Sequence, residues 1–228
     1  MKKIVNVKIN FAFTIFQRKG RTMYSQKMKN AVSSAQSCID MCCGAQNVAM
    51  TSAEYLSAFV KYLEVLDPSG IDFLKSGFFA ERRIKKYWQL FSEHYSKVTV
   101  IAEKLKQNRL IAENTLITLK SEQESFSSVY EEFLAEFAEN ADSEIMNQKT
   151  VAAGLKNILD NTVAEYGVLS ERLKNITTTA ADVFTNAVLI ARVNYQINLT
   201  GDVISGGSGT VDISGFRENF KKLLNLCR

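Results

Sequence analysis

The sequence is poor in the residues on which most enzymes and secreted proteins rely: its 228 residues include one histidine, one proline and four cysteines. A general base or nucleophile usually works as one member of a hydrogen-bonded pair, and a single histidine, His94, does not provide such a pair. Helical di-metal sites also require more than one histidine. We therefore expect a protein that is not an enzyme and that binds no cofactor and no metal.

Three of the four cysteines, Cys38, Cys42 and Cys43, fall within one expected helix. Adjacent positions on a helix diverge by about 100°, so these thiols do not form a compact set of metal ligands. A chain of this length with a full apolar core also has little need of disulfides. Core packing of Cys38 and Cys42 is the simpler interpretation, and it favours a cytoplasmic location.

Long uninterrupted apolar runs are missing as well. The apolar stretch at residues 4–16 is broken by Asn6, Lys8 and Asn10, and no other segment is long enough to span a bilayer. The only proline, Pro68, and most of the glycines lie outside the periodic segments, so little interrupts a helix between residues 25 and 199. These features predict an all-α chain that is soluble or peripheral to a membrane.

An apolar residue returns every three or four positions over the middle of the chain, which is the spacing of one helix face. At about 1.5 Å per residue this stripe would be roughly 80 Å long. Its members are Ile84, Tyr87, Phe91, Tyr95, Val98, Ala102, Leu105, Ala112, Leu116, Leu119, Phe126, Tyr130, Phe133 and Phe137. We expect one very long helix with a narrow apolar seam, as in a coiled coil or long bundle.

Turn-forming residues separate this helix from two others. Asp67-Pro68-Ser69-Gly70 and Asn140-Ala141-Asp142-Ser143 predict reversals of the chain. We therefore expect three long antiparallel, coiled-coil-like helices at about 22–66, 71–140 and 143–199. The second seam is too long for the first helix to cover, which predicts an elongated homodimer. Within the second helix, Asn108-Arg109 and residues 121–125 interrupt the seam and indicate either a kink or a polar layer.

The ends of the chain differ from this bundle. Residues 200–215 are rich in glycine and serine and predict a flexible linker, and residues 216–228 predict a short amphipathic helix that docks on the bundle. Residues 1–21 are basic and apolar. They fit an interfacial helix, a strand or disordered segment, or sequence upstream of a translation start at Met23.

Charge is unevenly distributed although the net charge is only +4. Residues 75–120 carry ten Lys or Arg against four Glu, whereas residues 121–145 carry eight acidic side chains and no basic ones. A basic helix face attracts anionic lipid by about 1 kcal/mol per side chain. The same charges also fit a merely solvated face or pairing with an acidic surface, and we expect no nucleic-acid partner.

Three long heptad-patterned helices, short reversals and a basic amphipathic amino terminus resemble the BAR domain superfamily over residues 22–199. The resemblance implies an elongated antiparallel homodimer at the cytoplasmic face of a membrane, which binds and bends anionic phospholipid. The chain differs from many members of this superfamily in that its expected reversal near Asn140 is acidic. The lipid-binding residues implied are Arg18, Lys19, Arg21, Arg82, Arg83, Lys85, Lys86, Lys104, Lys106 and Arg109.

Two other functions fit the same pattern. A coiled-coil scaffold would bind a protein partner without lipid. A helical membrane-perforating protein would insert an apolar segment, for which residues 4–16 are the only comparable stretch.

Overall fold

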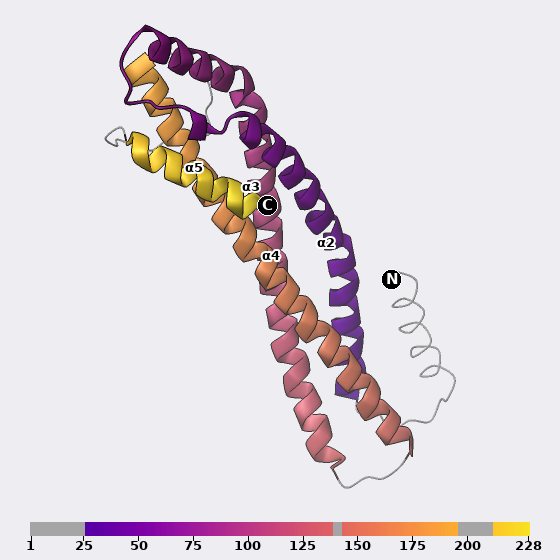
Figure 1. The fold of residues 1–228 in the computed structure, drawn as a ribbon. Coiled ribbons are helices and arrows are strands. Elements are labelled where there is room, and N and C mark those ends of the chain that lie inside the picture. The colour runs from indigo at the N-terminus through magenta and orange to yellow at the C-terminus, as the bar shows by residue number, and fades with distance from the viewer. Residues whose placement is uncertain (1–25, 139–142, 196–211) are drawn as a thin grey trace. The chain divides into compact units, whose positions relative to one another are not determined.

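A computed structural model describes residues 26–138, 143–195 and 212–228, and within these ranges the chain is all-α, without strands (Figure 1). The four α-helices of the described residues are α2 (Gln26–Val65), α3 (Phe78–Glu136), α4 (Ser143–Tyr195) and α5 (Ile213–Cys227). A short 3-10 helix, η1 (Pro68–Gly70), follows α2. The expected all-α class is confirmed. Residues 1–21 and most of the expected linker at 200–215 lie outside the described residues.

The chain divides into two compact units. The first unit comprises Met1–Gly44 and Thr115–Tyr166, and the second comprises Ala45–Asn114 and Gly167–Arg228. Helices α2, α3 and α4 each contribute residues to both units, whereas α5 belongs to the second unit alone.

The stripe expected on α3 is mostly buried. Ile84, Tyr87, Phe91, Tyr95, Val98, Leu105, Ala112, Leu119, Phe126 and Phe133 lie in the interior. Four further members, Ala102, Leu116, Tyr130 and Phe137, are only half-buried. The periodicity therefore identified the inward face of α3, because residues three and four apart lie on the same side of a helix.

In the first unit, small side chains of α2 such as Ala35 and Cys38 are buried. Hydrogen bonds then join the helices. The Tyr166 hydroxyl donates to the backbone oxygen of Cys42, with 3.4 Å between the oxygens, and the Gln123 side-chain amide donates to Asp160 at 2.6 Å. The Gln123 hydrogen bond, followed by that of Lys156, lowers the pKa of the Asp160 carboxyl. The polar stretch at 121–125 thus provides a polar contact between helices.

The core of the second unit is aromatic. The Trp88 side chain is fully buried, and its ring lies 5.7 Å from that of Phe73, 5.6 Å from that of Phe91 and 5.9 Å from that of Phe216. Tyr87 packs beside Trp88 and donates its hydroxyl to the backbone oxygen of Leu66 at 2.9 Å. Burial is the main reason that the pKa of Tyr87 is raised. One cluster therefore joins the α2–α3 connection, α3 and α5.

Helix α5 is held against this core by its apolar face. Phe216, Phe220, Leu223 and Leu224 are buried in the same cluster as Trp88. Asp212 caps the helix, because its carboxylate accepts a hydrogen bond from the Gly215 backbone amide at 2.9 Å. This cap explains why the helix begins at Ile213 and not at 216, as the sequence pattern suggested.

The connection from α2 to α3 also differs from expectation. The second helix begins at Phe78 and not at Ile71. Phe73 turns inward into the aromatic cluster, and Gly77 has a φ of 117°, which side chains other than glycine rarely adopt. Residues 71–77 therefore form a non-helical connection whose path is set by packing of Phe73.

A charge placed in the seam tests the inward face of α3. We expect Leu105→Asp to lower the free energy of unfolding by at least about 3 kcal/mol, because Leu105 is fully buried and an aspartate there has no partner. Val100→Asp is the matched control, since Val100 on the same helix is 54% exposed. Chemical denaturation followed by circular dichroism measures both changes, and equal stability of the two variants would contradict the assignment of the inward face.

Candidate functional site

The basic candidates on α3 fall into two groups in the second unit. Arg82, Arg83, Lys85 and Lys86 occupy the first turns of α3 and are all exposed. Among the described residues, no ion-pair or hydrogen-bond partner engages the side chain of any of these four. Their charges therefore face solvent. Because they flank the buried Ile84 and precede the buried Tyr87, the aromatic core directs them outward.

The other three candidates on α3 are engaged within the second unit. The Lys104 ammonium lies 5.1 Å from the centre of the Tyr55 ring, a distance at which a cation and a ring attract each other. Lys106 lies 3.6 Å from a carboxylate oxygen of Glu103. These two side chains remain at the surface, but each already has an intramolecular contact.

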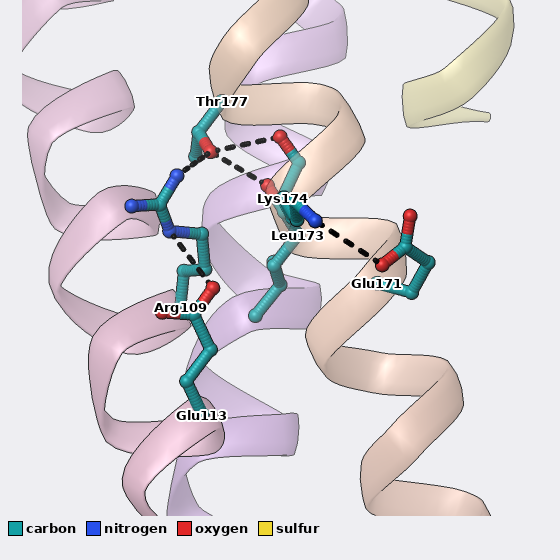
Figure 2. Close-up of polar contacts among 6 residues, drawn as sticks. All are labelled: Arg109, Glu113, Glu171, Leu173, Lys174 and Thr177. Atoms are coloured by element: carbon teal, nitrogen blue, oxygen red, sulfur yellow. Dashed lines mark hydrogen bonds and ion pairs between the residues drawn. The ribbon is translucent and has the colours of Figure 1, made fainter.

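Arg109 is the most enclosed of the candidates. Figure 2 shows its guanidinium between Glu113 on α3 and Thr177 on α4. Nη1 donates to the Thr177 hydroxyl at 3.3 Å, and Nε lies 3.4 Å from Glu113 Oε1, close enough for an ion pair although the N–H is not aimed at that oxygen. The Thr177 hydroxyl in turn donates to the backbone oxygen of Leu173 at 2.8 Å. Arg109 therefore helps to hold α3 against α4.

Asn108, next to Arg109, forms a polar layer with α2. Its side-chain amide donates to Thr51 and to Ser52, each at 3.0 Å. Helix α3 continues through this position, so the interruption of the seam at 108–109 is a polar layer and not a break in the helix. Paired polar groups of this kind favour one register between two helices.

Three remaining candidates, Arg18, Lys19 and Arg21, lie outside the described residues. No structural role is assigned to them.

Exposed apolar side chains, which the sequence patterns did not single out, lie beside the outward basic residues. Leu74 and Phe79 are each 79% exposed and Phe78 is 73% exposed. The rings of Phe78 and Phe79 meet edge to face with their centres 5.6 Å apart. The sequence contained one indication that these rings are exposed. The 3–4 stripe starts only at Ile84, and the side chains of two adjacent residues on a helix point in directions about 100° apart, so they do not share one inward face.

His94 lines a shallow groove of about 800 Å³ together with residues of α2 such as Glu54, Lys61 and Tyr62. The imidazole and Tyr62 rings lie 5.8 Å apart, and His94 Nδ1 has no hydrogen-bond partner among the described residues.

Burial raises the pKa of the Cys227 thiol to about 12, so this thiol is protonated at neutral pH. Neither this thiol nor His94 forms a nucleophile–base pair within the described part of the chain.

Within the described ranges, no group of three or more His, Cys, Asp or Glu side chains is placed to hold a metal ion. No helix in those ranges is long and apolar enough to cross a bilayer.

Comparison of the chain with protein-family models, curated proteins and solved structures finds no match.

The distinction between basic residues that are free in solvent, such as Arg82, and the engaged Arg109 is testable by alanine substitution. We expect Arg109→Ala to lower the free energy of unfolding by about 1–2 kcal/mol, because it removes the contacts with Glu113 and Thr177. Arg82→Ala serves as the control and is expected to change this free energy by less than about 0.5 kcal/mol. A larger loss of stability for Arg82→Ala than for Arg109→Ala in thermal or chemical denaturation would contradict this distinction.

Proposed function

We propose that this protein binds the anionic phospholipid surface of a membrane as a peripheral protein, through Arg82, Arg83, Lys85 and Lys86. These four residues are called the basic cluster below. The observation that carries the proposal is that all four side chains are exposed and have no ion-pair partner among the described residues.

The strength of the attraction follows from the number of charges. Each Lys or Arg near an anionic leaflet contributes about 1 kcal/mol, so the basic cluster contributes on the order of 4 kcal/mol. Every 1.4 kcal/mol is a tenfold change in an equilibrium constant, which makes this roughly a thousandfold preference for the anionic surface. Because surface charges are screened within about 10 Å at 0.1 M salt, the attraction must weaken as salt rises.

We infer an elongated antiparallel homodimer of the BAR type, in the cytoplasm, which senses or shapes membrane curvature. The antiparallel course of α2 and α3 within one chain is supported by paired positions whose numbers run in opposite directions: Thr51 of α2 with Asn108, and Leu66, just after α2, with Tyr87. Leu110 and Ile111, each nearly half exposed on α3, provide apolar surface that a second copy would cover.

The coiled-coil scaffold is the rival function. The same exposed Leu110 and Ile111 favour it, because they would equally contact a different protein. A scaffold predicts indifference to liposomes and saturable binding to a folded partner. The membrane-perforating alternative depends on residues 4–16, which lie outside the described part of the chain.

Charge reversal tests the basic cluster. The variant Arg82→Glu, Arg83→Glu, Lys85→Glu, Lys86→Glu is expected to abolish sedimentation with phosphatidylserine-containing liposomes while keeping the helical circular dichroism spectrum. The matched control reverses four other exposed lysines, Lys61, Lys120, Lys221 and Lys222, and lowers the net charge by the same amount.

We expect the control variant to sediment with liposomes much as the wild type does. Equal loss in the two variants would indicate a non-specific charge effect. Absence of wild-type binding at low salt would leave the scaffold function in its place.

The dimer is tested independently of lipid. Sedimentation equilibrium is expected to give twice the mass of the 25.6 kDa chain, and small-angle scattering is expected to give an elongated particle. A compact monomer would contradict the BAR-type architecture while leaving the basic cluster available for lipid.

A further inference from the structure

The connection between α2 and α3 and the first turn of α3 present the three most exposed large apolar side chains that the structure describes: Leu74, Phe78 and Phe79. Phe73, next to Leu74, takes the opposite direction and is 7% exposed, with its ring 5.5 Å from that of Tyr87. The fold therefore uses one aromatic residue of this connection as an anchor and leaves three apolar neighbours in solvent.

Local hydrogen bonds give the connection a defined path. The Asp67 carboxylate accepts from the Ser69 backbone amide at 2.9 Å, and the Asp72 carboxylate accepts from the Leu74 backbone amide at 3.2 Å. The Arg217 guanidinium of α5 donates to the backbone oxygen of Ser69 at 3.0 Å. Gly77, with its φ of 117°, then leads into α3. Leu74 and the two phenylalanines therefore lie on or next to a connection whose path is fixed by hydrogen bonds.

Leaving these three side chains in water does not stabilise the second unit. Burying a leucine or phenylalanine side chain stabilises a protein by about 1.5–3 kcal/mol relative to leaving it in water. Exposed apolar groups that cluster beside polar residues typically mark a surface that contacts a partner or a membrane.

The basic cluster continues the same surface. Phe78 and Arg82 are four residues apart on α3, as are Phe79 and Arg83, so each ring lies one helical turn from a guanidinium on the same side of the helix. Lys75, which is exposed, adds a positive charge between Leu74 and the rings. Apolar side chains bordered by Lys and Arg are typical of segments that lie in a membrane interface.

We propose that Leu74, Phe78 and Phe79 insert into the acyl region of an anionic bilayer, while the basic cluster and Lys75 contact the phosphate headgroups. The inference rests on the proposed function, because it adds apolar insertion to the electrostatic attraction. A lipid surface is favoured over a protein groove because residues 72–86 carry five exposed Lys or Arg side chains against two exposed acidic ones, Asp72 and Glu81, so the segment that presents the apolar side chains is net positive. The long stems of Lys and Arg can also extend to the headgroups as the rings enter.

Tryptophan fluorescence measures the insertion directly. The chain has one tryptophan, Trp88, which is fully buried and reports on the fold. Phe79→Trp adds an exposed reporter at the proposed insertion site. Val168→Trp is the matched control, because Val168 is also an exposed apolar residue of the second unit, at 72%.

Each protein is mixed at low salt with vesicles of phosphatidylserine and phosphatidylcholine whose acyl chains carry bromine, a short-range quencher. We expect the fluorescence of the tryptophan added at position 79 to be quenched by more than half. The fluorescence of the tryptophan added at position 168, and that of Trp88 in the wild type, is expected to be unchanged. Sedimentation of the same samples measures the fraction of each protein bound to vesicles, so that quenching is compared per bound molecule.

The outcomes separate insertion from electrostatic binding. Sedimentation without quenching of Phe79→Trp would overturn insertion and leave the proposed lipid-binding function intact. Quenching of both reporters to the same extent would also overturn it, since the contact would then not be specific to this connection. No sedimentation of any protein would overturn both proposals and leave a protein partner for the exposed rings.

A second variant tests the energetic role of the rings. Phe78→Ser with Phe79→Ser is expected to keep the helical spectrum and the Trp88 emission maximum, because both side chains are exposed. It should bind anionic vesicles at least about tenfold more weakly, and the deficit should persist at high salt, where apolar contacts are not screened. Unchanged binding at high salt would overturn insertion.

Discussion

The packing of aromatic rings around Trp88 is the constraint on which the second unit depends. Its neighbours come from three segments: Phe73 from the connection after α2, Phe91 from α3 and Phe216 from α5. Aromatic pairs at such distances stabilise a core beyond the area that they bury. Because Trp88 lies on α3, this packing sets the rotation of the start of that helix about its axis. The outward direction of the basic cluster and of the phenylalanines at 78 and 79 is a consequence of that rotation.

A second set of contacts sets the register between the helices of each unit. In the second unit Asn108 bonds to α2 and Arg109 to α4, so two adjacent polar residues of α3 connect it to both neighbours. In the first unit Gln123 and Asp160 form a comparable contact between α3 and α4. Apolar seams alone tolerate sliding, whereas a buried polar group that loses its partner costs about 1–3 kcal/mol. These contacts also explain why Arg109 is unsuited to hold a headgroup.

The proposed membrane contact combines two forces with different ranges. Charge attracts the protein from about a Debye length away, and apolar insertion acts only after contact. The start of α3 presents both kinds of side chain on neighbouring turns. Further along α3, in the first unit, Glu124, Glu131, Glu132 and Glu136 are exposed, so positive charge at the helix surface is concentrated toward its amino-terminal part. This uneven charge favours a defined contact over general adhesion of a basic rod.

The sequence alone determined the all-α class and the inward face of α3, because helical periodicity is local and three- or four-residue spacing places side chains on one side. It also identified the polar positions at 108–109 and 121–125, but it left open whether they bend the helix. Only the tertiary structure decided that Phe73 is buried while Leu74, Phe78 and Phe79 are exposed. It also decided that Lys104, Lys106 and Arg109 have contacts within the chain, whereas the basic cluster is exposed and has no ion-pair partner among the described residues. The physical reason is that burial and pairing depend on partners far along the chain, such as Phe216 and Thr177, and local spacing carries no information about which distant residue completes a contact.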